Sequence, residues 1–192
     1  YFVDFDLNKT LQEVKAVFQK NERLLKSRKN LKLIIDIENN NPAFIKSDEI
    51  RLKQILNNLI SNAIKFTPEG DIHVGYKVDK QNLLFYVSDT GVGMNPDVLN
   101  IIFERFRQAD SEYTRAVGGT GLGLSICKGL VKLLGGEIWV ESEKDKGSVF
   151  ISPYPLRKVR NGKPPGKAMK KTAKKMNFTG KAKPSLLPKM IP

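Results

Sequence analysis

The sequence predicts an α+β fold, a two-layer α/β sandwich in which helices cover one face of a mixed, mostly antiparallel sheet. Three observations support this prediction. Segments with helical periodicity are interleaved with segments of strand character from about residue 8 to residue 154. Two pairs of neighbouring strand segments are separated only by short polar turns, as in antiparallel hairpins. No internal repeat is present, so a solenoid or propeller is not predicted.

Four segments have the apolar spacing of helices, and most have recognisable ends. Ser47-Asp48 can cap a helix that Pro68 and Gly70 stop, and Asn95-Pro96 can open a short one. Gly135-Gly136 forms a C-cap. The predicted helices cover residues 8–28, 48–67, 95–106 and 122–134.

Five segments are rich in β-branched and aromatic residues or alternate apolar and polar positions with period two. They are residues 31–37, 72–78, 83–88, 137–142 and 148–154. The second and third form one hairpin, and the last two form another around residues 145–147.

The net charge of +13 is concentrated at the end of the chain. Of 33 basic residues, twelve lie in residues 157–192, which contain no Asp or Glu, so 21 basic and 20 acidic residues remain before them. We therefore expect one nearly neutral domain over residues 1–156 and a basic Pro/Gly/Lys-rich linker or disordered tail over 157–192. A nucleic-acid-binding function would depend on that tail alone, and no specific nucleic acid is expected as a partner.

Two features bear on the cellular compartment. The single cysteine, Cys127, rules out an internal disulfide and fits a reducing compartment. No apolar run approaches the roughly 18 residues that a membrane-spanning helix needs. We therefore expect a cytoplasmic domain, with any membrane anchor of the parent protein upstream.

The stretch "ILNNLISNAIKF" (55–66) places asparagines in an apolar helix, although asparagine is a poor helix former. At about 100° per residue, Arg51, Asn58, Asn62 and Lys65 fall on one stripe, opposite the apolar side. Amide oxygens suit a hard cation such as Mg²⁺, and an ammonium group suits phosphate. The alternative is an ordinary solvated stripe.

The stretch "SDTGVGM" (88–94) follows a strand directly. Asp89 lies where the backbone turns, and Gly91 and Gly93 permit close approach or positive φ. A carboxylate at a buried strand end can accept a hydrogen bond from an exocyclic amine such as that of adenine. A plain tight turn would show the same pattern.

The stretch "GGTGLGLS" (118–125) places glycines before a helix, whose free N–H groups attract anions. It lacks the third small residue of a Rossmann fingerprint and the Gly-Lys-Ser/Thr of a P-loop. It is therefore a phosphate-binding loop of another type or a glycine hinge.

The aperiodic segment 107–119 between "IIFERF" (101–106) and the glycines predicts a lid whose Arg115 could reach a terminal phosphate. A surface loop is the alternative reading.

In their order along the chain, "NNLISNAIKF", "DTGVGM", "FERF" and "GGTGLGL" resemble the N box, first glycine box, F box and second glycine box of sensor histidine kinase catalytic domains. That domain belongs to the GHKL superfamily, with gyrase B, MutL and the ninety-kilodalton heat-shock chaperone, and has the Bergerat fold. The resemblance covers residues 4–156 and implies a protein histidine kinase domain that uses ATP and Mg²⁺, from a sensor kinase of the hybrid two-component type. An ATPase of the same superfamily and an anti-sigma-type serine kinase are the alternatives.

The resemblance implies a role for each box residue. Asn62 would bind Mg²⁺ with support from Asn58, and Lys65 would contact phosphate. Asp89 would take the adenine amine in a pocket shaped by Gly91 and Gly93. The triphosphate would lie against the second glycine box under the lid, which gives the set Arg115, Gly119, Thr120, Gly121, Leu122 and Gly123.

The departures from the family concern the chemistry around the phosphoryl group. The only histidine, His73, lies in the strand pattern "IHVGYKV" and is read as a sheet-face residue. The resemblance therefore implies a histidine-bearing dimerisation and phosphoacceptor domain before Tyr1, and a receiver domain or response regulator as the next partner. Asn58 stands where the ATP hydrolases carry a glutamate base, so slow hydrolysis is expected. Because the chain lacks a plausible acceptor histidine, the isolated chain is not expected to phosphorylate itself.

Overall fold

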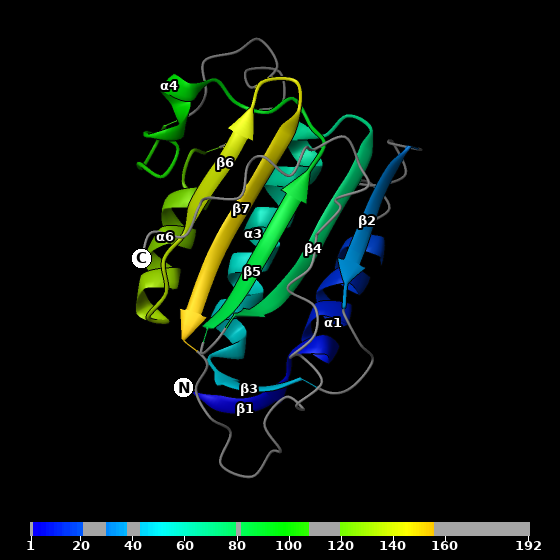
Figure 1. The fold of residues 1–192 in the computed structure, drawn as a ribbon, viewed down its shortest axis with the longest axis vertical. Coiled ribbons are helices and arrows are strands. Elements are labelled where there is room, and N and C mark those ends of the chain that lie inside the picture. The colour runs from blue at the N-terminus through cyan, green and yellow to red at the C-terminus, as the bar shows by residue number, and fades with distance from the viewer. Residues whose placement is uncertain (1, 21–29, 38–42, 80–81, 108–119, 156–192) are drawn as a thin grey trace.

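A computed structural model describes residues 2–20, 30–37, 43–79, 82–107 and 120–155. Its centre is a five-stranded sheet in the order β2-β4-β5-β7-β6 (Figure 1). Only β2 and β4 pair in parallel, and the other neighbours are antiparallel. The strands are β2 (Leu31–Asp36), β4 (Gly70–Asp79), β5 (Asn82–Asp89), β6 (Trp139–Glu143) and β7 (Gly147–Pro155).

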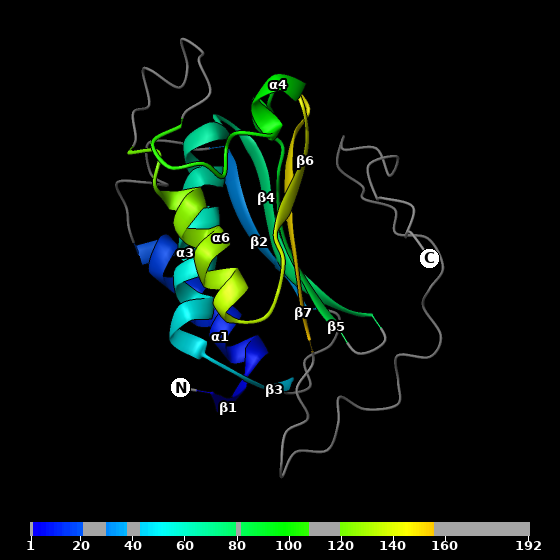
Figure 2. The same ribbon diagram turned by 90° about the vertical axis from the view of Figure 1, so that its left-hand side faces the viewer.

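Three helices cover one face of this sheet, as Figure 2 shows in side view. They are α1 (Leu7–Lys20), α3 (Glu49–Phe66) and α6 (Gly123–Leu133). The predicted two-layer α+β sandwich is confirmed. Among the described residues, none of the helices combines the length and apolar character needed to cross a bilayer.

The core lies between the helices and the alternate strand positions that face them. Ile72 and Val74 of β4 are fully buried, and Ile60 of α3 is fully buried on the helical side. Period-two patterning on the strands and the apolar stripe of α3 are therefore satisfied by the same interface.

Two parts of the chain differ from the sequence prediction. Strands β1 (Val3–Asp6) and β3 (Phe44–Ser47) form a separate antiparallel pair that the sequence analysis did not predict. The helix expected over residues 95–106 is wrong beyond its first turn, because α4 covers only Pro96–Leu99 and turns follow. At the far end of this segment Phe106 has φ = +62°, and its N–H donates to the carbonyl of Gly121, so its last residue is not helical. The predicted helix 8–28 is described as far as Lys20.

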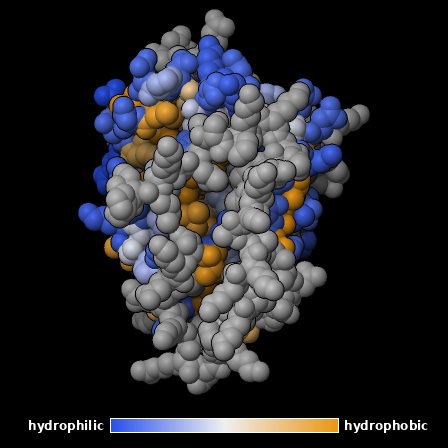
Figure 3. All heavy atoms as spheres, viewed as in Figure 1, coloured by the Kyte–Doolittle hydropathy of each residue, from blue (hydrophilic) through white to orange (hydrophobic). Residues whose placement is uncertain are grey.

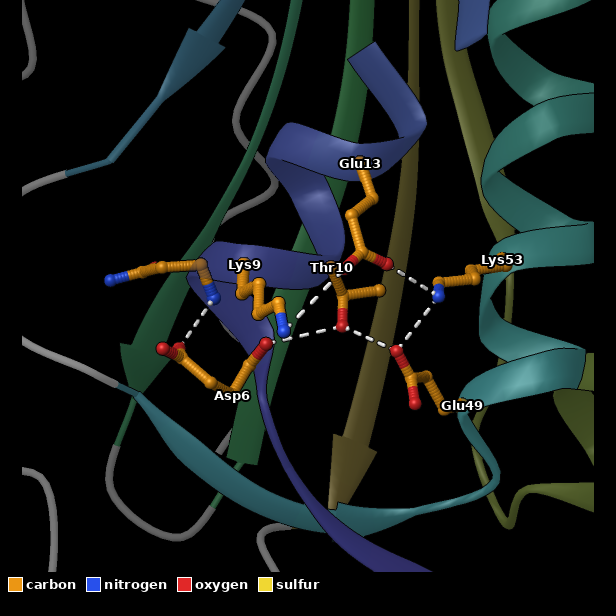
Figure 4. A network of polar contacts seen from close by, with 7 residues as sticks. Asp6, Lys9, Thr10, Glu13, Glu49 and Lys53 are labelled. Atoms are coloured by element: carbon orange, nitrogen blue, oxygen red, sulfur yellow. Dashed lines mark hydrogen bonds and ion pairs between the residues drawn. The ribbon is translucent and has the colours of Figure 1, made fainter. Parts of the chain in front are cut away.

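Polar contacts join α1 to α3 beside the core (Figure 4). Lys53 Nζ lies 2.8 Å from Glu13 and 2.9 Å from Glu49, and the Thr10 hydroxyl donates to Glu49 Oε1 at 3.0 Å. Hydrogen bonds to Glu13 and Glu49 raise the pKa of Lys53 above its usual value. These contacts fix the first helix against the helix that carries the asparagines.

The sheet face without helices bears the single histidine, as predicted. His73 lies one position after buried Ile72 in β4, so its side chain is on the opposite face from the core. Its Nδ1 lies 3.1 Å from Asp36 Oδ2, and the hydroxyl of Tyr86 donates to the same oxygen at 2.9 Å. Figure 3 views this face and shows apolar side chains among polar ones along the strands.

Candidate functional site

Asp89 ends β5 on the helix-covered side of the sheet and is 5% exposed. Its Oδ1 accepts a hydrogen bond from the backbone N–H of Gly91 at 2.9 Å. Burial raises the pKa of Asp89 to about 6, although hydrogen bonds from the backbones of Gly91 and Ser148 oppose the shift. Within the described part of the chain the hydrogen-bond partners of this carboxylate are backbone groups, so it retains acceptor capacity for a ligand.

The two glycines after Asp89 are required by backbone contacts. A Cβ on Gly91 would lie 2.2 Å from the carbonyl oxygen of Phe66, the last residue of α3. Gly93 has φ = +60°, and a Cβ there would lie 1.9 Å from the carbonyl oxygen of Glu143. The turn after β5 therefore packs directly on the end of α3 and on the β6–β7 turn. The expected need for close approach and positive φ is met at these two positions.

The amide stripe of α3 lies toward the same end of the sandwich. Asn58, Asn62 and Lys65 are half-buried, in contrast with the apolar side of the helix. The side-chain nitrogen of Asn62 lies 3.9 Å from an ideal Cβ placed on Gly123, the first residue of α6. The first and third of the four stretches are thus adjacent in space, while Arg51 pairs with Asp48 at the other end of the helix.

The second glycine stretch leads into α6. Gly121 has φ = +68° and its carbonyl accepts the N–H of Phe106 at 3.1 Å, which joins the F-box segment to this loop. Leu122 caps α6 without a side-chain hydrogen bond, and Thr120 is exposed. The N–H groups of the first turn of α6 are the ones that an anion can accept from.

Two predicted ligand residues, Arg115 and Gly119, and the predicted lid lie outside the described residues.

Helix α6 packs on α3 through its cysteine. Cys127 is fully buried, and its Sγ lies 3.8 Å from the carbonyl of Ile55. Burial raises the pKa of the thiol to about 11, and a contact with the Asn58 side chain opposes that shift. The thiol is therefore a neutral packing group, as predicted, and it contacts the amide stripe at Asn58.

Sequence reasoning missed four residues that hold Asp89 in place. Gly147 and Ser148 begin β7, where Ser148 is the register partner of Asp89. Ser142 of β6 contacts Ser148, with 3.0 Å between their hydroxyl oxygens. Thr90 Oγ1 accepts the N–H of Asp71 and so fixes the turn to β4. The sequence signal was the motif "KGS" (146–148), which was read only as a hairpin turn.

A cavity at the opposite end of the sandwich contains none of these residues. It is lined by Phe2, Ile45, Leu52, Leu83 and Tyr154 among others, beside β1 and β3. Its mostly apolar lining supplies neither the acceptor nor the amide groups that a nucleotide needs, so the candidate site is the end where β5 and α3 finish and α6 begins (Figure 1).

The geometry of that end suits a polyphosphate attached to an amine-bearing base. It combines a buried acceptor at Asp89, neutral amides at Asn58 and Asn62, and a helix N-terminus at Leu122. Within the described ranges there is no group of three or more His, Cys, Asp or Glu side chains that could hold a metal. A hard cation here would be held by amide oxygens together with oxygens of its ligand.

The chain matches a known family of proteins. Residues 47–158 match the family described as histidine kinase-, DNA gyrase B- and HSP90-like ATPase. This range contains all four stretches that the sequence analysis singled out.

Curated relatives are sensor kinases. The autoinducer 2 sensor kinase/phosphatase LuxQ of Vibrio vulnificus is 51% identical over 120 residues, which cover 59% of this chain and 14% of that protein. The hybrid signal transduction histidine kinase B of Dictyostelium discoideum is 40% identical over 157 residues, which cover 79% of this chain and 8% of that protein. The chain spans less than a fifth of the length of these relatives.

Solved structures share the fold. The catalytic domain of histidine kinase ThkA matches with a TM-score of 0.67 and 30% identity, covering 81% of this chain and 96% of that one. Full-length ShkA in complex with AMPPNP matches with a TM-score of 0.69 and 29% identity, covering 82% and 32% respectively. The chain thus belongs to the histidine kinase-, DNA gyrase B- and HSP90-like ATPase family, and its described residues form a histidine kinase catalytic domain.

Proposed function

We propose that this domain binds Mg²⁺-ATP and donates the γ-phosphoryl group to a histidine on a separate phosphoacceptor domain. The observation that supports this most directly is the meeting of buried Asp89, the Asn58/Asn62 stripe and the start of α6 at one end of the sandwich. The AMPPNP bound to the related ShkA is a nucleotide of the same class.

Each residue has a role that its chemistry permits. Asp89 accepts a hydrogen bond from the exocyclic amine of adenine. Gly91 and Gly93 allow the turn after β5 to pack directly on the end of α3 and on the end of β6. Asn62 ligates Mg²⁺ with Asn58 beside it, and Lys65 contacts phosphate oxygens. Backbone N–H groups of Gly121, Leu122 and Gly123 orient the triphosphate, together with Gly119, Thr120 and the lid residue Arg115.

Bound Mg²⁺ supplies charge neutralisation of the phosphates as the phosphoryl group leaves. The chain's own contribution is to position the triphosphate and to limit transfer to water. Asn58 carries no basic atom that could remove a proton from water, so the residue that a hydrolase would use as general base is absent from this position of α3. This observation favours the kinase over the hydrolytic members of the family.

The acceptor histidine is supplied from outside the described residues. His73 lies on the sheet face opposite Asp89 and is engaged by Asp36, so it cannot reach a phosphate bound at the start of α6. We propose a histidine-bearing dimerisation domain upstream in the parent protein, in the cytoplasm, and a receiver domain or response regulator as the next acceptor. The related ThkA has been solved with the response regulator TrrA.

The proposal is tested by incubating the chain with Mg²⁺ and γ-labelled ATP, with and without the helical phosphoacceptor domain of a related sensor kinase. We expect acid-labile label on the added domain and none on this chain. An added domain whose acceptor histidine is replaced by glutamine is the control. Label on His73, or phosphate release as fast as in a hydrolase, would contradict the proposal.

A further inference from the structure

Three polar residues form one row across the strands at the ATP-site end of the sheet. The register pairs Ser142 of β6 with Ser148 of β7, and Ser148 with Asp89 of β5. Their side chains lie on the helix-covered face, because Phe150, two residues after Ser148, belongs to the core. Facing side chains in such a row have Cβ atoms roughly 4.5–5.5 Å apart. Ser148 therefore lies between a second hydroxyl and the carboxylate of Asp89.

The hydroxyl protons in this row have a defined direction. Ser142 Oγ donates to the carbonyl oxygen of Gly147 at 2.9 Å and lies 3.0 Å from Ser148 Oγ. A serine hydroxyl has one proton and two acceptor lone pairs. Because Ser142 uses its proton on Gly147, the contact between the two serines requires Ser148 to donate. Ser148 Oγ is then an acceptor toward any further partner.

The row is held rigidly against the end of β5. Gly147 has φ = +101°, and a Cβ there would lie 2.0 Å from the carbonyl oxygen of Asp89. Ser148 is 7% exposed and Asp89 is 5% exposed, so neither side chain has ready access to water as an alternative partner. Unmatched donors or acceptors at this position are therefore costly.

Two neighbouring acceptors match a ligand group that carries two N–H donors. The exocyclic amine at position 6 of adenine is such a group, whereas the oxygen at position 6 of hypoxanthine or guanine is itself an acceptor. We propose that Ser142 is a positioning residue for base recognition: it fixes Ser148 as an acceptor, so that Ser148 and Asp89 together select 6-aminopurines over 6-oxopurines. This inference rests on the proposed binding of adenine at Asp89.

The test compares the affinities of ATP and inosine triphosphate by calorimetry with Mg²⁺ present. Their bases differ in the group at position 6 and in the proton that the 6-oxo form carries on N1. Wild type should favour ATP. In Ser142→Ala the proton of Ser148 is released and can serve a 6-oxo group, so the ATP-to-inosine-triphosphate affinity ratio should fall about three- to tenfold, as for one neutral hydrogen bond. Ser148→Ala, which removes the second acceptor, should also lower the ratio.

The chain offers a matched control in Ser152, four residues along β7 on the same face. Its Oγ donates to the carbonyl of Glu137 at 2.7 Å, and it is 2% exposed. Ser152→Ala therefore removes a comparable buried hydrogen bond away from Asp89 and should leave the ratio unchanged. A change in the ratio as large as that in Ser142→Ala would show that the effect is general destabilisation of the sheet and would overturn the inference.

A near-isosteric pair gives a second measurement if Ser142→Ala does not fold. Ser142→Thr keeps the hydroxyl and should retain the wild-type ratio, whereas Ser142→Val should lose it. Equal ratios in the two variants would overturn the positioning role while leaving ATP binding intact. Failure of the wild type to bind ATP, or undiminished ATP affinity in Asp89→Ala, would instead overturn the proposed function.

Discussion

The carboxylate of Asp89 accepts the backbone N–H of Gly91, two residues later, at 2.9 Å, while almost no surface of Asp89 is exposed. This hydrogen bond stabilises the charged carboxylate, but burial outweighs it and the pKa of Asp89 is raised to about 6. The proposed adenine acceptor is therefore ionised at neutral pH at a cost to the stability of the domain.

We predict that Asp89→Asn stabilises the nucleotide-free protein while weakening ATP binding, because a neutral amide oxygen is a weaker acceptor than a carboxylate. The pKa of Asp89 is about 6 in the folded protein and 3.8 for an unperturbed aspartate, so the folded state binds this proton more tightly than the unfolded chain. The group's contribution to stability is therefore greatest at low pH and is lost as pH rises from about 4 through 6. At about 1.4 kcal/mol per pKa unit, the loss approaches about 3 kcal/mol at pH 7.5 and is about half that at pH 5.

Urea unfolding of wild type and Asp89→Asn at pH 5 and pH 7.5 measures this pH-dependent loss of stability. The other titratable groups contribute equally to the stability of both proteins, so their effect cancels in the difference. The free energy of unfolding of Asp89→Asn should exceed that of wild type by more at pH 7.5 than at pH 5. A pH-independent difference would show that the carboxylate does not carry the raised pKa. Calorimetry with ATP on the same samples separates the stability gain from the loss of the adenine contact.

Gly91→Ala should destabilise the domain and disrupt the site. The added Cβ would lie 2.2 Å from the carbonyl oxygen of Phe66, which also accepts the N–H of Val92 at 3.0 Å. Both elements are fixed, so the clash must be relieved by backbone movement, and we expect a loss of roughly 1–3 kcal/mol or more. Chemical denaturation of the purified variant measures it.

Gly129→Ala is the control for that substitution. Gly129 lies within α6, is exposed, and a Cβ there would meet no atom within 4 Å. Alanine is the better helix former, so this variant should gain about 0.5–1 kcal/mol of stability. If both substitutions destabilised the protein equally, the packing of Gly91 on Phe66 would not account for the loss of stability in Gly91→Ala.

Asn62→Ala should lower Mg²⁺-ATP affinity at least about tenfold, which corresponds to about 1.4 kcal/mol, without unfolding the domain. The affinity for ATP in the presence of a chelator should be the same as in wild type, because the lost interaction is with the metal. Alanine has the higher helix propensity, so α3 should persist. Calorimetry in Mg²⁺ and in EDTA gives both affinities.

Asn57→Ala is the matched control, since Asn57 is on the same helix but about 100° away from the stripe. Its Oδ1 is buried and has no hydrogen-bond partner in the described part of the chain. Its replacement should leave the Mg²⁺ dependence of ATP binding unchanged. A Mg²⁺-specific loss in Asn57→Ala but not in Asn62→Ala would reverse the assignment.

The sequence predicted the parts of the fold and site that are local. Asp89 and its glycines, and the asparagines of α3, are recognisable because their chemistry conflicts with ordinary strand and helix patterns. The pairing of β1 with β3 was missed because it joins residues about 40 positions apart through two four-residue strands. The non-helical end of the 95–106 segment was missed because Phe106 pairs with the carbonyl of Gly121, which is distant in sequence.

The contact of Ser148 with Asp89 and Ser142 was missed for a related reason. Period-two patterning indicates which face of a strand is buried, but it does not give the register between strands. Only the observed pairing of β7 with β5 and β6 shows that these three side chains form one row.

The last prediction concerns residues 157–192, which lie outside the described structure. The stretch "NFTGKAK" (177–183) resembles the approach to a receiver domain, but "PSLLPKMIP" (184–192) does not continue as the first strand of one. The relative from Dictyostelium discoideum is a hybrid kinase. We propose that the reading frame recorded for this chain departs from the natural frame near Lys183.

A permitted back-translation of residues 183–192 carries the argument. The string AAA CCA TCC TTA TTG CCG AAG ATG ATA CC, read from its third base, becomes ACC ATC CTT ATT GCC GAA GAT GAT ACC and encodes Thr-Ile-Leu-Ile-Ala-Glu-Asp-Asp-Thr. A β-rich run followed by acidic residues is the pattern of a receiver's first strand and its Mg²⁺-binding carboxylates. Sequencing the parent DNA tests this: we expect an acidic receiver start in the shifted frame, followed by a receiver domain. Codons that cannot encode such a start, with no receiver downstream, would show that the basic ending is the natural sequence.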